Sequence, residues 1–353
     1  MSGRSVAAAA GPDGGGGRGS RAADRGAGSA ATAGGAGGGE AWWVEAGLRV
    51  FFWAARSLPW ALRWSRGAWV WAAWAAAAEM RRAVRANLRR VLPEGASEAE
   101  VDRVGRGVVA SFYAFVCEVA ANHRRSLPEL IARIERVEGG EAFLAERQRR
   151  RGAVLVTAHF GNFEVGLAAM REIEPRVHVV FQRDRMGRFE RLRRELHQRL
   201  GIVETPIDDG MASWLALRDA LQADGVVMLQ GDRTMPGQRG LAVEILGPGR
   251  GHVELPIGPA KLAAMTGAPL VPVFAIRRRG GKVEVRLGRV IEVARGGEEA
   301  ATRAVGLAIG EMIRECPRQW HVLQRAFVED GAAAGSGVEG ERRSAAGQGV
   351  GAG

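Results

Sequence analysis

The stretch "VLVTAHFGNFEVG" (residues 154–166) carries two side chains suited to acid–base chemistry, His159 and Glu164. Both follow a run of apolar and β-branched residues. On one continuous helix, side chains five residues apart would point in directions that differ by roughly 140° and would not face each other. Gly161 permits a sharp turn, however, and Asn162 is a good N-cap for a helix that begins directly after it. We therefore expect a strand, a turn and a helix that bring His159 and Glu164 together.

Such a pair predicts general-base catalysis. A glutamate that accepts a hydrogen bond from one imidazole nitrogen fixes the tautomer, and the other nitrogen can then remove a proton from a substrate hydroxyl. The helix dipole favours an ionised Glu164 in the first turn. Backbone N–H groups of residues 161–163, at the start of that helix, are candidates to bind an oxyanion. The sequence has no Gly-x-Ser-x-Gly elbow. We therefore expect the substrate hydroxyl itself to be the nucleophile, without a covalent enzyme intermediate.

The elements that would position this pair can be predicted from the hydrophobic pattern. Short β-branched runs separated mostly by helical segments predict buried strands at residues 153–158, 177–182, 226–230 and 269–276, and the alternating segment 282–293 predicts a half-exposed strand. Residues 93–151 have a helical pattern. The expected fold class is therefore α/β, with a central, mostly parallel sheet flanked by helices. His159 would follow the first strand at its carboxyl end, where open α/β sheets usually bind ligands.

Two further strand ends carry candidate binding residues. Arg183 follows the strand at 177–182 and is a candidate to bind a phosphate or sugar of a substrate. Asp232 and Arg233 follow the strand at 226–230 and could shape the acceptor site, or they could form an internal ion pair. The other histidines have no ligand-like spacing, so neither a metal nor another cofactor is expected.

Composition divides the chain into four parts. Residues 1–40 and 329–353 are rich in glycine and alanine with little to bury, and we expect disordered tails there. Residues 41–92 form a tryptophan-rich, membrane-associating helical region, which lies ahead of an α/β domain with leading helices at 93–328. The two cysteines, Cys117 and Cys316, form no Cys-x-x-Cys pair, which favours a reducing compartment.

The tryptophan-rich part indicates contact with a membrane surface. It holds eight of the ten tryptophans: Trp42, Trp43, Trp53, Trp60, Trp64, Trp69, Trp71 and Trp74. Its longest charge-free stretch, residues 67–78, is shorter than the roughly 20 residues that cross a bilayer. An interfacial helical hairpin fits better, because tryptophan rings and arginine stems suit the bilayer interface. The alternative is that these aromatic side chains form a soluble core.

Net charge is consistent with an anionic partner. The 50 Lys and Arg residues against 39 Asp and Glu residues give +11. This balance favours phosphorylated lipids, acidic carrier proteins or nucleic acid, and it does not choose among them.

Seven segments of the chain resemble the lipid A biosynthesis (late, lauroyl/myristoyl-type) acyltransferases, a family within the lysophospholipid acyltransferase superfamily. "HFGNFE" resembles that family's His-x4-Glu signature. The other similar segments are "SLPWALRW" with "RRAVRANLRRVLPEGASEAE", then "VVFQR", "GDRTMPGQRGLAVEILG", "LPIGPAKLAAMTGAPLVPVF" and "CPRQW". The resemblance covers residues 41–327.

The resemblance implies transfer of a fatty acyl group, from acyl carrier protein or acyl-CoA as thioester co-substrate, to a hydroxyl of a lipid A-type or other glycolipid. It implies His159 as the base, Glu164 as its partner, and Gly161, Asn162, Arg183, Asp232 and Arg233 near the substrate. It also implies a peripheral or monotopic protein at the cytoplasmic face of the inner membrane.

Two alternatives remain at this stage. The nearer is a lysophospholipid or glycerol-phosphate acyltransferase, which would share the histidine but usually carries aspartate in place of Glu164. The other is a non-catalytic basic protein that binds membrane or nucleic acid. Nucleic-acid binding would require aromatic residues interleaved with basic ones on an accessible face, whereas these tryptophans cluster with alanine and leucine, so nucleic acid is not expected as a partner.

Overall fold

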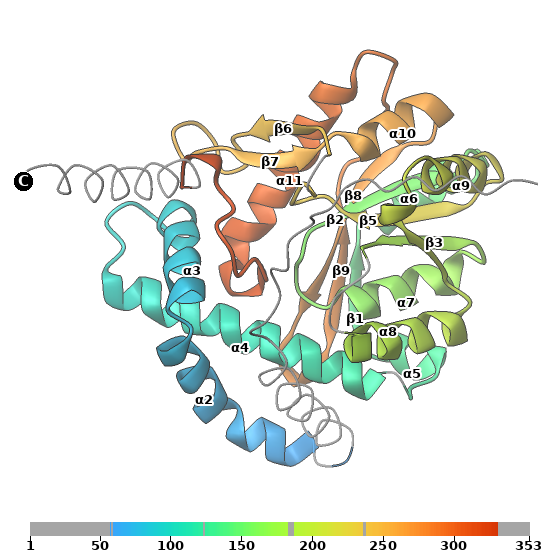
Figure 1. Cartoon of the computed structure of the whole chain (residues 1–353). Helices are drawn as coiled ribbons and strands as arrows, with labels where there is room; N and C mark the ends of the chain where they lie inside the picture. The colour runs from blue at the N-terminus through green and yellow to red at the C-terminus, as the bar shows by residue number, and fades with distance from the viewer. Residues whose placement is uncertain (1–56, 58, 123, 183–186, 236–237, 331–353) are drawn as a thin grey trace, which may run out of the picture. The chain divides into compact units, whose positions relative to one another are not determined.

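The computed structural model describes residues 57, 59–122, 124–182, 187–235 and 238–330 (Figure 1). The predicted tail at 1–40, the start of the tryptophan-rich region, almost all of the predicted tail at 329–353 and the candidate residue Arg183 lie outside the described residues.

A seven-stranded sheet forms the centre of the fold. In spatial order its strands are β1 (Ile134–Glu138), β9 (Val283–Leu287), β8 (Leu270–Arg277), β2 (Ala153–Thr157), β5 (Val226–Gln230), β3 (Val177–Phe181) and β4 (Val203–Pro206). All neighbouring pairs are parallel except β8 and β9. The predicted α/β class with a mostly parallel sheet is confirmed, and each predicted strand segment overlaps an observed strand. The half-exposed strand expected at 282–293 is wrong in its burial, because four of the five residues of β9 are buried.

The sequence pattern missed the two edge strands. Residues 93–151 were expected to be helical throughout, and this is wrong for β1. Its sequence, "IERVE", has no fully buried residue, so it lacks the apolar run that marks the central strands. The other edge strand, β4, has only four residues, "VETP". Edge strands are often short and charged, which weakens their signal.

Helices cover both faces of the sheet. One face carries α5 (Leu127–Ile131), α6 (Gly140–Arg147), α7 (Phe163–Ile173) and α8 (Gly187–Leu200), and the other carries α9 (Met211–Gln222), α10 (Gly258–Thr266) and α11 (Glu298–Glu315). Strand β2 is buried on both sides because Leu155 faces the first layer while Val154 and Val156 face the second. Each fully buried side chain of this size contributes about 1.5–3 kcal/mol. A hairpin of β6 (Gly240–Val243) and β7 (Val253–Pro256) packs on α11.

Three helices precede the sheet and form their own apolar cluster. These are α2 (Pro59–Ala76), α3 (Ala78–Val91) and α4 (Glu98–Asn122). Trp74 of α2 is buried against Gly105 of α4, where an added Cβ would come within 2.4 Å of the indole ring. Trp74 therefore packs in the protein core, as in the alternative to membrane contact that the sequence left open.

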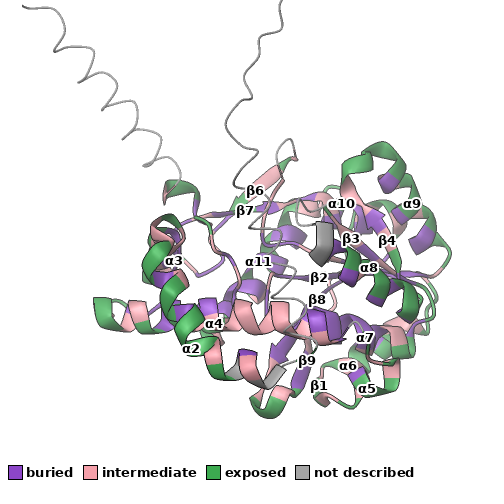
Figure 2. Cartoon of the chain, turned by 60° about the horizontal axis from the view of Figure 1, so that its bottom comes forward, coloured by how far each residue is buried: buried purple, intermediate pink, exposed green. Residues whose placement is uncertain are grey.

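The other described tryptophan side chains of α2 point outward. Trp64, Trp69 and Trp71 are 87%, 55% and 69% exposed, and Figure 2 shows exposed residues along this helix. Trp64 and Trp71 are seven residues apart, so they lie on one helical face. This face is what an interfacial helix requires.

Helix α4 is the one described helix that is long and apolar enough to cross a membrane. It contacts α2, α3, α8 and the short helix η3 (Pro317–Gln319). Its Glu118 binds Arg133 and Arg277 of the α/β domain at 2.9 Å each. These ion pairs tie α4 to the sheet.

Candidate active site

His159 and Asp232 meet because two neighbouring parallel strands end at the same level. Strands β2 and β5 pair in register up to Thr157 and Gln230. His159 and Asp232 each lie two residues beyond that last pair. The carboxyl ends of adjacent parallel strands share one edge of the sheet, so both side chains emerge there.

A short hydrogen bond joins the two side chains. Nδ1 of His159 lies 2.7 Å from Oδ1 of Asp232, and the backbone N–H of His159 donates to Oδ2 at 3.0 Å. The Asp232 side chain has no exposed area, whereas that of His159 is 29% exposed. Because a carboxylate accepts hydrogen bonds, Nδ1 of a neutral His159 carries the proton, and Nε2 then holds the lone pair that can act as a base.

Trp320 provides a further hydrogen bond to the carboxylate. Its indole Nε1–H donates to Oδ2 of Asp232 at 3.0 Å. Burial by itself raises the pKa of Asp232, but the charge of His159 and the hydrogen bonds from His159 and Trp320 outweigh it and lower the pKa below its usual value. Asp232 therefore stays ionised beside the imidazole.

The segment after α11 also fixes the backbone of the catalytic turn. Gly161 N–H donates to the carbonyl of Gln319 at 3.0 Å, and the N–H of His321 donates to the carbonyl of His159 at 2.7 Å. The His321 ring lies 2.9 Å from the Ser111 hydroxyl of α4. Burial, together with the charge of nearby Arg277, lowers the pKa of His321 to about 3, so this ring is neutral.

Glu164 lies elsewhere than predicted. It occupies the first turn of α7 and is buried, but its Oε2 lies 2.8 Å from Nε2 of His197 on α8. The expected hydrogen bond between Glu164 and His159 is therefore wrong in this structure. The turn at 160–162 places Glu164 in the helix layer beside α8, while the partner of His159 comes from the neighbouring strand.

Gly161 and Asn162 form the predicted turn and N-cap. Gly161 has φ +59°, and an added Cβ would come within 2.0 Å of the carbonyl oxygen of Ala275. The Asn162 side chain accepts from the N–H of Val165 at 3.2 Å. However, the N–H groups of Gly161 and Asn162 already donate to the carbonyls of Gln319 and Ala275. In this geometry these two N–H groups are therefore occupied by backbone carbonyls, and an oxyanion site at the N–H groups of residues 161–163 stays a prediction.

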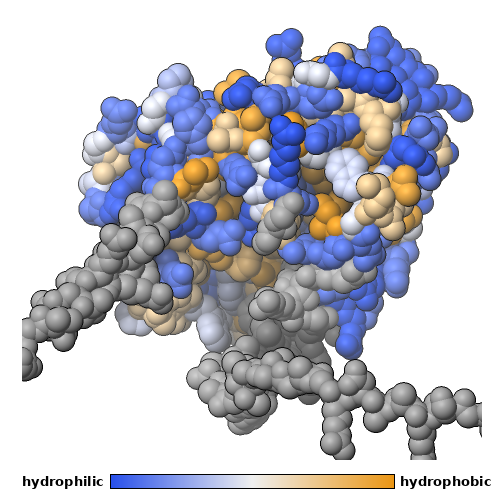
Figure 3. Space-filling model, turned by 45° about the horizontal axis from the view of Figure 1, so that its top comes forward, coloured by the Kyte–Doolittle hydropathy of each residue, from blue (hydrophilic) through white to orange (hydrophobic). Residues whose placement is uncertain are grey.

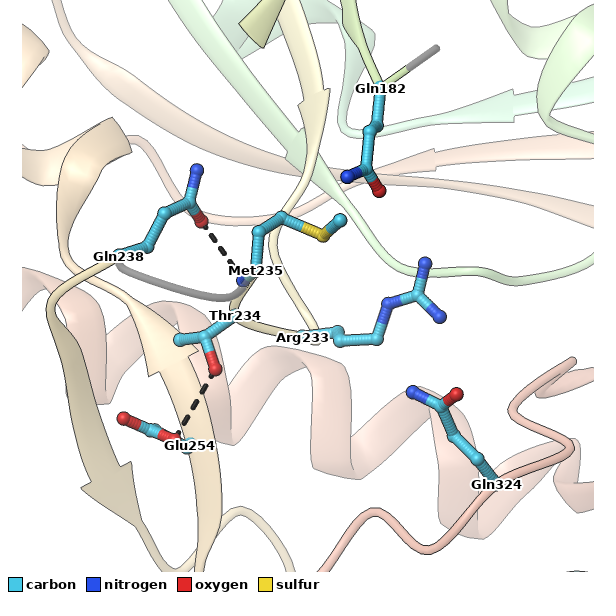
Figure 4. Close-up of a pocket in the computed structure, with 7 residues that line it drawn as sticks. All are labelled: Gln182, Arg233, Thr234, Met235, Gln238, Glu254 and Gln324. Atoms are coloured by element: carbon cyan, nitrogen blue, oxygen red, sulfur yellow. Dashed lines mark hydrogen bonds between the residues drawn. The ribbon is translucent and has the colours of Figure 1, made fainter. Parts of the chain in front are cut away.

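A polar cavity lies at the ends of β3 and β5. It has a volume of about 620 Å³ and is lined by Gln182, Arg233, Thr234, Met235, Gln238, Glu254 and Gln324. Figure 4 shows the Arg233 guanidinium extending between Gln182 and Gln324. Thr234 donates to Glu254 at 3.3 Å, and the N–H of Met235 donates to Gln238 at 3.2 Å.

Arg233 has no hydrogen-bond or ion-pair partner among the described residues, and its Nε is buried without one. The alternative of an internal ion pair between Asp232 and Arg233 is therefore not observed, because Asp232 binds His159 and Trp320. A guanidinium that faces a cavity without a partner is suited to an anion. Arg183, the other predicted anion ligand, lies outside the described part of the chain.

The surface seen in Figure 3 is largely hydrophilic, with hydrophobic residues in the hollows between charged ones. Within the described ranges, no three His, Cys, Asp or Glu side chains lie close enough to hold a metal ion.

Comparison with known proteins assigns the family. Residues 41–329 match the sequence pattern of the bacterial lipid A biosynthesis acyltransferase family. The chain belongs to this acyltransferase family. The match covers most of the chain and confirms the resemblance seen in the sequence motifs.

Two mycobacterial proteins are similar to part of this chain. The chain is 30% identical over 224 residues to a phosphatidylinositol mannoside acyltransferase of Mycobacterium tuberculosis. The aligned region covers 59% of this chain and 64% of that protein. It is 28% identical over 182 residues to the protein of the same name from Mycolicibacterium smegmatis, covering 51% of this chain and 58% of that relative. The chain thus spans less than two thirds of the length of either relative.

Sequence reasoning missed three features of the candidate site and the cavity. It placed Asp232 near the acceptor and not beside His159, it gave Trp320 no individual role, and it did not find Gln182 or Gln324. The pair of His159 and Asp232 depends on the pairing of β2 with β5, which the sequence does not show. No local pattern marks the glutamines, which come together only in the folded chain.

Proposed function

We propose that this protein is an O-acyltransferase that moves a fatty acyl group from a thioester donor to a sugar hydroxyl of a membrane glycolipid. The observation that carries the proposal is the hydrogen-bonded pair of a partly exposed His159 and a buried Asp232, in which Nε2 of His159 has no hydrogen-bond partner among the described residues. Membership of the acyltransferase family and the names of the mycobacterial relatives support it.

The proposed reaction proceeds in two steps. The acceptor hydroxyl gives its proton to Nε2 of His159 as its oxygen attacks the thioester carbonyl carbon, and Asp232 stabilises the imidazolium that forms. The tetrahedral intermediate then collapses, the carbon–sulfur bond breaks, and the thiolate takes the proton from Nε2. The products are the acyl ester and the free thiol, and His159 returns to its neutral state.

The polar cavity is the proposed acceptor site. Amide side chains of Gln182, Gln238 and Gln324 offer both donors and acceptors, which suits sugar hydroxyls, and Arg233 offers a cation for a phosphate. This chemistry fits a phosphorylated glycolipid better than an acceptor without a sugar. Phosphatidylinositol mannoside is therefore the first acceptor to test, and a lipid A precursor is the second.

The proposed donor is acyl carrier protein or acyl-CoA, and no metal or other cofactor takes part. We further propose that the protein works at the cytoplasmic face of the inner membrane, where thioester donors are available. The outward tryptophans of α2 would contact the interface, because the indole ring is apolar while its N–H needs a polar partner.

The test measures transfer of labelled acyl groups by the full chain in lipid vesicles. Acyl-CoA and acyl carrier protein are compared as donors, each with phosphatidylinositol mannoside, a lipid A precursor or a lysophospholipid as acceptor. Labelled glycolipid formed by the wild type and lost in His159→Ala supports the proposal. Label found only in the lysophospholipid products, or equal transfer by His159→Ala, would overturn it.

A further inference from the structure

A buried chain of charged side chains links α7, α8 and β4. Oε2 of Glu164 lies 2.8 Å from Nε2 of His197, and Nδ1 of His197 lies 2.7 Å from Oε1 of Glu204. The side chains of Glu164 and His197 are 2% and 1% exposed, and that of Glu204 is 11% exposed. An imidazole that faces a carboxylate on each nitrogen must donate from both, so His197 is an imidazolium.

The charges around His197 favour that state. Burial alone would lower the pKa of His197, but the charges of Glu164 and Glu204 and their hydrogen bonds raise it to about 9. The neighbouring arginines of α8 balance the second carboxylate, since Arg193 and Arg194 lie 3.8 Å and 3.5 Å from Glu204. Arg194 also pairs with Glu190.

The same cluster reaches the wall of the cavity. The Arg193 guanidinium lies over the ring of Phe181, 4.8 Å from its centroid, at the last residue of β3. The next residue, Gln182, lines the cavity beside Arg233. Helix α8 is therefore held at α7 by Glu164, at β4 by Glu204, and at the end of β3 by the contact of Arg193 with Phe181.

We propose that Glu164 is a positioning residue, which acts through His197 to hold α8 and the end of β3 so that Gln182 faces the acceptor. Asp232, and not Glu164, serves His159. The proposal rests on the proposed function for its kinetic part alone. It predicts that loss of Glu164 weakens acceptor binding while the acid–base chemistry of His159 persists.

The alternative, in which Glu164 turns to His159, conflicts with the contacts of both groups. Nδ1 of His159 is already bound to Asp232. Moving Glu164 would remove one of the two carboxylates from the buried His197 imidazolium. A buried charge that loses its partner is strongly disfavoured.

The kinetic experiment varies the acceptor at a saturating donor concentration. For Glu164→Gln and for His197→Gln we expect the KM for the glycolipid to rise about tenfold, with kcat within about threefold of wild type. In both variants, kcat should fall on acidification over the same pH range as in wild type. Asp232→Asn should instead lower kcat by about 10²–10⁴-fold.

The double variant Glu164→Gln/His197→Gln gives the matched control. Each single change leaves a buried charged partner behind, whereas two glutamines can bond each other as neutral groups. The KM of the double variant should therefore return toward the wild-type value. A kcat loss in Glu164→Gln like that of Asp232→Asn, kept in the double variant, would overturn the proposal.

A second measurement does not depend on activity, and its first part needs only the wild type. In the wild-type full chain, the ¹⁵N resonances of the His197 ring should show both nitrogens protonated at pH 7.5. In folded Glu164→Gln the His197 signals should shift while those of His159 stay unchanged. A neutral His197 in the wild type, or His159 signals that move in Glu164→Gln, would contradict the proposal. If the wild type acylates no acceptor, the proposed function fails, while these signals still test the role of Glu164.

Discussion

Nδ1 of His159 lies 2.7 Å from Oδ1 of Asp232, a residue 73 positions further along the chain, while Glu164, only five residues away, is bound to His197. The partner of the proposed base is thus set by the pairing of β2 with β5. The nearby motif residue instead joins two helices. In the proposed mechanism, His159 and Asp232 do the chemistry, while Glu164 holds the site.

Trp320 should tune the proposed catalytic pair. Trp320→Phe keeps an aromatic ring but removes the N–H that donates to Asp232 Oδ2. Because Asp232 is fully buried, losing this donor should destabilise the fold by about 1–3 kcal/mol. It should also raise the pKa of Asp232, since a hydrogen bond to its charged form is lost.

The measurement is chemical denaturation together with the pH dependence of kcat. For Trp320→Phe we expect a lower denaturation midpoint, and activity that falls at a higher pH than in wild type as the solution is acidified. Trp214→Phe, a change of the same kind at a half-buried tryptophan on α9, is the control. Equal effects of the two changes on the pH profile would count against the role of Trp320.

His197 should make stability depend on pH. Its pKa is about 9 in the folded protein and 6.5 for the free side chain. A raised folded-state pKa means that the stabilisation is fully present below about pH 6.5 and is lost as the pH rises through 9. The difference in unfolding free energy between wild type and His197→Gln should therefore be largest near pH 6, on the order of 3 kcal/mol.

Urea denaturation between pH 6 and 9.5 measures this difference. His252→Gln is the matched control, because His252 also binds a glutamate, Glu329, but its side chain is 45% exposed. Its loss should change stability little across the range. If the difference in unfolding free energy between wild type and His197→Gln grows as the pH rises, the predicted direction of the pH dependence is wrong.

Arg233 should bind an anionic group of the acceptor. Arg233→Gln removes the cation but keeps a polar side chain in the cavity. We expect the KM for a phosphorylated glycolipid to rise about tenfold or more, because charge-assisted hydrogen bonds are lost. The KM for an analogue without the phosphate should change much less.

Acceptor titration with both lipids checks this prediction. Arg103→Gln is a suitable control, since Arg103 forms an exposed ion pair with Glu100 within α4. A KM increase of the same size for both lipids would argue that Arg233 only maintains the shape of the cavity.

The outward tryptophans of α2 should determine vesicle binding. Replacing Trp64 and Trp71 together with serine removes two exposed rings from one face without touching the buried Trp74. We expect binding to anionic vesicles to weaken by about tenfold or more.

Co-sedimentation with vesicles of phosphatidylglycerol and phosphatidylethanolamine provides the measurement. Met211→Ser is the control, because Met211 is 72% exposed on α9, away from α2 in the sequence and outside its cluster. If the double tryptophan variant binds vesicles as well as wild type does, α2 is not the membrane contact.

Much of this protein could be predicted from its sequence because the information is local. The central strands are continuous apolar runs, and the turn at Gly161 with its cap at Asn162 follows from residue type. His159 could be placed at the end of a strand for the same reason. The motifs also identified the family, and the comparisons confirm it.

Only the tertiary structure decided the partners. A pattern along the chain shows which residues end a strand, but it does not show which strand lies beside it, so the pairing of His159 with Asp232 could not be derived from spacing. Glu164 was assigned to His159 because it was near in sequence, while the buried surface between α7 and α8 gave it His197. The cavity likewise needs residues from β3, β5 and the segment after α11. Strand order and helix packing create these contacts, and both are properties of the whole fold.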